Sequence, residues 1–211
     1  MKKNYLTQAE RSQFTLSADL KAILFGLLLG DLCANKEKRS VNARLLFSQG
    51  TIHNEYLFHL YDLFKHYCLT EPKVSNRSPD KRTGKIYTSV SFNTRALPCF
   101  NELYDLFYPE GKKVVPLDIE DLLTPLGLAY WICDDGKYVD SGGLRLCTNS
   151  YSIQDVTRLK DVLITHYGLI CTIHKTQKGQ HLIFISKNSM DKLRSIVKQH
   201  MVPNMLYKIH L

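Results

Sequence analysis

The chain has 211 residues, of which 44% are hydrophobic and 23% are charged, a composition typical of a globular protein. Its formal net charge of +8 at pH 7 favours a polyanionic partner, and nucleic acid is the most common one. The longest apolar stretch, residues 22–30, is too short to span a bilayer, and the six cysteines include no Cys-x-x-Cys pair of a zinc site.

A weak internal repeat, with a period near half the chain, is the most informative feature of the sequence. Each repeat begins with a predicted apolar helix that ends in aspartate. The first helix covers residues 20–31 and ends in Asp31, and the second covers residues 126–135 and ends in Asp135. The duplication of both the helix and its final carboxylate indicates a shared role for the two ends.

The same order of elements is predicted after each of these helices. A strand, an amphipathic helix, a β-hairpin and a third helix follow at 42–49, 52–67, 73–93 and 96–107, and again at 143–149, 153–167, 169–185 and 188–200. This order predicts an α+β fold of two pseudo-symmetric units with antiparallel sheets. We expect helices on one face of each sheet and polar and basic residues on the other. The units should cover residues 1–110 and 124–211, with 111–123 as the linker.

The first apolar helix carries small residues on one face, because Ala22, Gly26 and Gly30 are spaced four residues apart. Such a stripe allows a second helix to pack closely. If the two helices run in the same direction, Asp31 and Asp135 meet, and a divalent cation such as Mg²⁺ would relieve their repulsion. For either helix alone, a buried core helix ending in a solvated aspartate is the better account, and only the duplication of helix and aspartate favours the metal site.

The two helices also carry a recognisable motif. Segments 25–32 (Phe-Gly-Leu-Leu-Leu-Gly-Asp-Leu) and 128–136 (Leu-Ala-Tyr-Trp-Ile-Cys-Asp-Asp-Gly) resemble the signature helices of the LAGLIDADG homing endonucleases, in particular the single-chain members encoded by mitochondrial introns. The resemblance extends over residues 17–208. Leu32 departs from the usual glycine, and Tyr130 and Asp134 stand where small residues are usual. We therefore expect the second helix to pack through Ala129 and Cys133.

The resemblance implies a monomeric enzyme that places a saddle-shaped antiparallel sheet in the major groove of a long, asymmetric double-stranded DNA site. It would cut both strands across the minor groove, beneath the paired central helices. Mg²⁺ would be the cofactor, with Mn²⁺ as a substitute, whereas Ca²⁺ would bind without supporting cleavage. The implied metal ligands are the carboxylates of Asp31 and Asp135 and the backbone of Gly30 and Asp134. The implied catalytic residues are Asp31, Asp135, Lys113, Lys208, Gln49 and Asn149.

Basic residues gather in the predicted strands and loops of both repeats, where some would contact phosphates and others base edges. They are Lys36, Lys38, Arg39, Arg44, Lys73, Arg77, Lys81, Arg82, Lys85, Lys137, Arg145, Lys175 and Lys178.

Two other functions share many of these features. An intron maturase has the same fold and binds RNA to assist splicing, and a non-catalytic DNA-binding protein would need the basic sheets alone. The presence of both aspartates and both lysines favours the nuclease. The resemblance also implies an organelle-encoded protein, of mitochondrial or chloroplast origin.

Overall fold

A computed structural model describes residues 5–76, 78–79 and 82–211, and the chain forms two compact units. The first unit comprises the residues up to Ser17 together with Leu32–Asp105, and the second comprises Ala18–Asp31 and Leu106–Leu211. This division follows packing, because the first apolar helix is grouped with the second half of the chain. The predicted boundaries of the two sequence repeats concern the sequence and not packing, so they stay a prediction.

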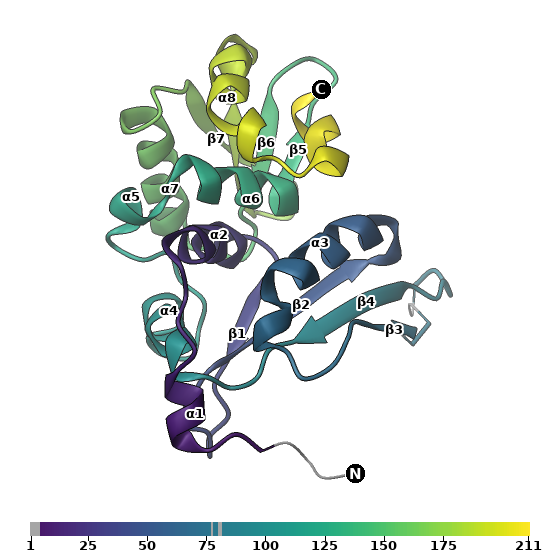
Figure 1. The fold of residues 1–211 in the computed structure, drawn as a ribbon. Coiled ribbons are helices and arrows are strands. Elements are labelled where there is room, and N and C mark those ends of the chain that lie inside the picture. Colours follow the sequence, from purple (N-terminus) through teal and green to yellow (C-terminus); the bar gives the residue numbers. More distant parts are fainter. Residues whose placement is uncertain (1–4, 77, 80–81) are drawn as a thin grey trace. The chain divides into compact units, whose positions relative to one another are not determined.

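The elements follow the predicted order in both halves of the chain (Figure 1). The first half contains α1 (Gln8–Ser12), α2 (Ala18–Leu29), β1 (Cys33–Asn35), β2 (Arg44–Gly50), α3 (Asn54–Phe64), β3 (Lys73–Asn76), β4 (Thr88–Asn93) and α4 (Asn101–Phe107). The second half contains α5 (Ile119–Leu122), α6 (Pro125–Asp135), β5 (Gly136–Tyr138), β6 (Leu144–Cys147), α7 (Ile153–Thr165), β7 (Cys171–Lys175), β8 (His181–Ile185), α8 (Met190–Val197) and the 3-10 helix η6 (Pro203–Ile209). The α+β class is confirmed. The short elements α1, β1, α5 and β5 were not expected.

The first unit is built on an antiparallel sheet with the strand order β1-β2-β4-β3, and α3 lies across one face of it (Figure 1). Phe47 of β2 stacks on Phe92 of β4, with ring centroids 4.4 Å apart, and lies 5.2 Å from Phe64 of α3. These rings form the core between helix and sheet. Because side chains alternate along a strand, Arg44 and Ser48 project from the opposite face of the sheet.

The second unit repeats this arrangement with the antiparallel strand order β5-β6-β8-β7, packed against α7. Ser152 caps α7, because its hydroxyl accepts the backbone N–H of Asp155 at 3.1 Å. Gly168 ends this segment, since it adopts a positive φ of 60° just beyond the helix.

The paired helices α2 and α6 lie side by side within the second unit (Figure 1). A Cβ atom on Gly26 would collide with the backbone carbonyl of Gly127, and a Cβ on Gly127 would lie 2.8 Å from the carbonyl oxygen of Ala22. The small stripe of α2 therefore faces α6, as predicted. The expected partner residues were wrong, because Gly127 makes the close approach, whereas Cys133 turns its Sγ towards Met201 at 3.8 Å. Ala129 is fully buried.

Helices α2 and α6 are buried on nearly all sides, since every residue from Ile23 to Leu29 and from Gly127 to Cys133 is buried. A helix that is apolar all round belongs in a protein interior. Among the residues that the structure describes, no helix combines the length and apolarity that crossing a membrane requires.

Candidate functional site at the ends of the paired helices

Two carboxylates lie at the C-terminal ends of the paired helices. Asp31 follows α2 after Gly30, and Asp135 is the last residue of α6. Gly26 packs on Gly127 and Gly30 packs on Asp134, so the helices run in the same direction and their C-terminal ends meet. This confirms the predicted geometry of the pair.

The pKa of Asp135 shows which charges surround it. Burial, and after it the negative charge of Asp31, raise this pKa to about 7, although the ammonium groups of Lys113 and Lys208 act in the opposite direction. Four of the predicted catalytic residues, Asp31, Asp135, Lys113 and Lys208, therefore lie within electrostatic reach of one another in the second unit.

The two lysines occupy matching places. Lys113 Nζ donates a hydrogen bond to the backbone carbonyl of Gly30 at 2.7 Å, and Lys208 Nζ donates to the carbonyl of Asp134 at 2.7 Å. Each lysine thus holds the peptide that precedes one of the two aspartates. Lys208 is only 8% exposed, and burial lowers its pKa.

The donor set at these helix ends fits a hard cation. It consists of the carboxylates of Asp31 and Asp135 and the carbonyl oxygens of Gly30 and Asp134, all of them oxygen ligands of the kind that Mg²⁺ prefers. Each carbonyl keeps a second lone pair beside its lysine contact. Within the described part of the chain, no group of three or more His, Cys, Asp or Glu side chains could hold a metal ion. Water and substrate phosphates would therefore complete the coordination, as is usual for Mg²⁺.

Two further contacts at this site were not predicted. The hydroxyl of Tyr151, which is buried, lies 3.2 Å from the carbonyl oxygen of Leu28 and 3.1 Å from that of Leu29, at the end of α2. The last carbonyls of a helix lack a donor from the following turn, and the single hydroxyl hydrogen of Tyr151 is shared between these two. The carboxylate of Asp134 accepts the backbone N–H of Asp31 at 3.0 Å. Tyr151 is an isolated aromatic in the sequence, with no spacing that marks it.

The two predicted amides lie in different units. Gln49 is half-buried near the end of β2, on the face of the first sheet that also carries Leu45 and Phe47. Asn149 is exposed in the turn that follows β6 in the second unit. A role for either amide in ordering water stays a prediction.

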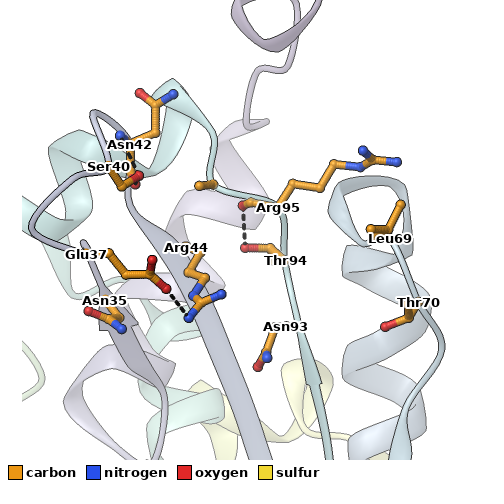
Figure 2. A pocket seen from close by; sticks show the side chains of 11 residues that line it. Asn35, Glu37, Ser40, Asn42, Arg44, Leu69, Thr70, Asn93, Thr94 and Arg95 are labelled. Carbon is orange, nitrogen blue, oxygen red and sulfur yellow. Dashed lines mark hydrogen bonds and ion pairs between the residues drawn. The ribbon is translucent and has the colours of Figure 1, made fainter. Parts of the chain in front are cut away.

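The open face of the first sheet is polar. Arg44 of β2 lies beside Asn35 of β1 and near Asn93 of β4, and Lys73 of β3 projects from the same face. Asn35, Arg44 and Asn93 border a cavity of about 330 Å³ at one end of the sheet (Figure 2). The guanidinium of Arg44 forms an ion pair with Glu37 at 2.7 Å, which orients it at the cavity (Figure 2).

The open face of the second sheet combines basic and aromatic side chains. Lys137 of β5 and Arg145 of β6 are neighbours across the strands, and both are exposed. Phe184 of β8 lies next to Arg145 and stacks on the ring of His174 at 5.1 Å. No sequence pattern indicates this stack. Lys175, proposed for DNA binding, alternates to the other face at the end of β7.

The other basic residues proposed for DNA binding occupy loops and turns where the structure describes them. They are Lys36, Lys38, Arg39, Arg82, Lys85 and Lys178. Arg77 and Lys81 lie outside the described residues.

Comparison with known proteins agrees with this geometry. The sequence profile of the LAGLIDADG DNA endonuclease family matches residues 21–193. The DNA endonuclease I-ChuI of Chlamydomonas applanata is 32% identical over 212 residues, covering 92% of this chain and 96% of that protein. The cytochrome b mRNA maturase bI2 of Debaryomyces hansenii is 38% identical over 198 residues, covering 92% of this chain and 74% of that protein.

Among solved structures, the homing endonuclease I-WcaI bound to its DNA recognition sequence matches with a TM-score of 0.90 at 24% identity, covering 99% of this chain and 94% of that one. At this identity the match shows the fold, and the fold is that of the family profile. With the paired helices and their two aspartates in place, the chain belongs to the LAGLIDADG DNA endonuclease family.

Proposed function

We propose that this protein is a homing endonuclease that binds a long, asymmetric site on double-stranded DNA and hydrolyses both strands across the minor groove with Mg²⁺. The observation that carries the proposal is the pair of carboxylates, Asp31 and Asp135, at adjacent helix ends, each with a lysine on the peptide before it. A relative 32% identical, which the chain matches almost end to end, is named a DNA endonuclease.

The carboxylates would hold the cation together with the carbonyl oxygens of Gly30 and Asp134. When bound, Mg²⁺ supplies positive charge that stabilises the phosphate during hydrolysis. The raised pKa of Asp135 indicates that its ionised form is costly without a cation, so metal binding and loss of its proton are coupled. Mn²⁺ should replace Mg²⁺, and Ca²⁺ should bind without supporting cleavage.

The lysines contribute fixed positive charge at the same place. Lys113 and Lys208 are held by the carbonyls of Gly30 and Asp134, so their ammonium groups do not need to reorganise when negative charge develops on the phosphate. Lys208 is buried, which strengthens its interaction with that charge. Burial also lowers the pKa of Lys208, which favours its neutral form. In that form the amine would have a second role, as the base that accepts a proton from water.

The open sheet faces would contact the DNA. The exposed cations Lys137 and Arg145 lie on adjacent strands of the second sheet, and Arg44 and Lys73 project from one face of the first sheet. Such cations suit the phosphates and base edges of the major groove. We therefore assign both open faces to the DNA interface.

A second function, assistance of intron splicing, is favoured by one observation. The Debaryomyces hansenii relative, 38% identical, is named a cytochrome b mRNA maturase. That name also supports an organellar origin, with the mitochondrion favoured over the chloroplast. Both functions can reside in one chain, because splicing assistance requires RNA binding and leaves the aspartates unused. A non-catalytic DNA-binding protein, by contrast, leaves the buried Lys208 beside Asp134 and Asp135 without an explanation.

The direct experiment is selection of cleaved sites from a randomised double-stranded DNA library in Mg²⁺. The proposal expects one long, asymmetric consensus with short 3′ overhangs, no cleavage in Ca²⁺, and no cleavage by Asp31→Asn or Asp135→Asn although both still bind the selected DNA. Wild-type protein that binds intron RNA but cuts no library member in Mg²⁺ or Mn²⁺ would leave the maturase as the function.

A further inference from the structure

Asp134 makes a contact that ties the ends of the two helices together. The last turn of α2 tightens, because the backbone N–H of Gly30 is shared between the carbonyls of Gly26 at 3.3 Å and Leu27 at 3.0 Å. The N–H of Asp31 donates to Oδ2 of Asp134 on α6, at 3.0 Å. A carboxylate is a stronger acceptor than a peptide carbonyl, so this bond ends α2 and fixes the peptide that carries Asp31.

Gly30 is the residue that makes room for Asp134. A Cβ atom on Gly30 would lie 2.6 Å from Cβ of Asp134 and 2.7 Å from its Oδ2. No methyl group fits there unless Asp134 moves and its bond to Asp31 breaks. The aspartate that departs from the family's small residue is thus matched by a glycine on the facing helix.

The backbone of Asp134 faces the other lysine. Its carbonyl accepts a hydrogen bond from Lys208 at 2.7 Å, and the next residue is Asp135. One residue is therefore bonded to Asp31 by its side chain and to Lys208 by its backbone. At the matching position of α2, Gly30 has no side chain. A side-chain hydrogen bond from this position to the facing aspartate therefore exists on α6 and not on α2.

We propose that Asp134 is a positioning residue that sets the place of Asp31 relative to Asp135 and Lys208 through its side-chain bond to the Asp31 N–H, and that Gly30 is required because it faces this side chain. The inference rests on the proposed nuclease function and adds a residue to it. Asp134 acts through Asp31. Because Gly30 offers no such bond to Asp135, the two aspartates are held in different ways.

Two substitutions separate the hydrogen bond from the charge. Asp134→Asn keeps an oxygen acceptor for the Asp31 N–H and removes the charge, whereas Asp134→Ala removes both. We expect Asp134→Ala to lower kcat on the selected DNA about 100-fold, the usual cost of misplacing a reacting group by about 1 Å, with KM changed less than about 3-fold. Asp134→Asn should recover most of this loss. An Asn variant as slow as the Ala variant would show that charge, and not position, is what Asp134 contributes, and would overturn the proposal.

Cation binding gives a readout without DNA. Trp131 is the one tryptophan of the chain and lies one helical turn before Asp135, so it can sensitise luminescence of Tb³⁺ bound at the helix ends. Tb³⁺ titration of the full-length protein should show affinity lowered about 10-fold or more by Asp134→Ala and less by Asp134→Asn. Asp135→Asn serves as the control that the signal comes from this site. Equal Tb³⁺ affinity in wild type and Asp134→Ala would count against any positioning of Asp31.

A thermal unfolding cycle tests the fit of Gly30. Gly30→Ala in the wild type should lower Tm by roughly 4–8 °C, the usual effect of overpacking in a chain of this size. The same change in the Asp134→Gly background should leave Tm unchanged or raise it, because all three close atoms are then absent. Cleavage by the double variant should stay as slow as that of Asp134→Ala, since the acceptor is missing. If Gly30→Ala changes Tm equally in both backgrounds, glycine at position 30 is not required by its contact with Asp134.

The failures of the two proposals are distinguishable. If the wild type cuts no library DNA, the nuclease proposal falls, and the Tb³⁺ and unfolding measurements still decide whether Asp134 holds Asp31. If the wild type cuts and Asp134→Ala cuts equally fast, the nuclease stands and the positioning role is wrong.

Discussion

At the scale of single residues, the ionisation of Asp135 opposes folding when no cation is bound. Its pKa in the folded protein is raised to about 7, chiefly by burial and then by the charge of Asp31. Between about pH 4 and pH 7 the folded state therefore binds more protons than the unfolded state, and this residue's contribution to stability falls as pH rises through that window. At pH 8 the buried charge is fully expressed.

We predict that Asp135→Asn stabilises the cation-free protein more at high pH than at low pH. Relative to wild type, the free energy of unfolding of the variant should gain on the order of 2 kcal/mol between pH 5 and pH 8, given about 1.4 kcal/mol per pKa unit and some solvent screening. Urea denaturation in EDTA at both pH values measures this. The exposed Asp140→Asn is the control for loss of one charge. A variant effect that is equal at the two pH values would contradict the pKa assigned to Asp135.

The two lysines should act on the rate of cleavage more than on DNA affinity, because the charge they meet is greatest in the transition state. We expect Lys113→Met and Lys208→Met each to lower kcat by about 100-fold or more, with Kd for DNA changed less than about 3-fold. The effects should be unequal, because Lys208 is buried and Lys113 is half-exposed. Nicking assays that follow the top and bottom strands separately measure this.

Lys112→Met is the matched control, because Lys112 is exposed and adjacent in sequence to Lys113. If neither Lys113→Met nor Lys208→Met slows cleavage of either strand, both lysines belong to the ordinary basic surface and the catalytic assignment is wrong.

At the scale of secondary-structure elements, the contact of α2 with α6 depends on glycine at two positions. Gly26→Ala would drive a methyl group into the carbonyl of Gly127, and the two helices would have to move apart. We predict a loss of about 3 kcal/mol or more in the free energy of unfolding, at the upper end of the usual cost of overpacking. Urea denaturation at pH 5 measures it.

Gly50→Ala is the control for this prediction. Gly50 has an ordinary φ of −62°, and its nearest atom to an added Cβ is Cγ2 of Ile52 at 3.9 Å. The change should be neutral or slightly stabilising, because alanine restricts the unfolded chain more than glycine does. Equal effects of Gly26→Ala and Gly50→Ala would mean that the close approach of the helices does not depend on glycine.

Hydrophobic periodicity and turn signals predict the longer elements well. The apolar helices, the strands β2 and β8 and the capped helix α7 lie within a few residues of their expected positions. The strands β1 and β5 were missed because three residues are too few to show alternation. The third helix of the first repeat was predicted too long, because Pro98 begins a 3-10 turn and α4 starts only at Asn101.

The candidate site was predicted in its charges and not in its backbone contacts. Duplicated aspartates and lysines stand out in the sequence because their residue types are conspicuous. The bonds from Lys113 and Lys208 to carbonyls, and the Tyr151 hydroxyl at the end of α2, involve peptide groups that no sequence pattern displays. The choice of Gly127 over Cys133 at the helix contact likewise depends on the rotation of α6, which its nearly continuous apolar surface leaves undetermined.

At the scale of the whole molecule, DNA binding should be strongly dependent on salt. A protein that neutralises several phosphates releases their counterions, so log affinity falls linearly with log salt concentration. We predict that Lys137→Ala and Arg145→Ala each weaken binding and reduce the magnitude of the slope by about one for each phosphate that the wild-type side chain neutralises. Fluorescence anisotropy from about 50 to 200 mM salt measures this. Lys198→Ala, an exposed change beyond α8, is the control. If neither Lys137→Ala nor Arg145→Ala alters the slope, the second sheet is not part of the DNA interface.

The pairing of both aspartates within one chain makes a further prediction about the assembly that cuts. Asp31 and Asp135 lie in the same compact unit, so the active enzyme should be a monomer with one chain on each DNA site. Mixing Asp31→Asn protein with Asp135→Asn protein should then restore no cleavage, because neither chain carries both carboxylates. If instead α2 of one chain packed on α6 of another, half of the sites in the mixed dimer would combine an intact Asp31 with an intact Asp135. Strand cleavage by the mixture, after unfolding and refolding the two proteins together, is therefore the measurement, with each variant alone as the baseline. Activity above that baseline would contradict the pairing of the helices within one chain, and sedimentation of the wild type on its selected DNA would then have to show two chains per site.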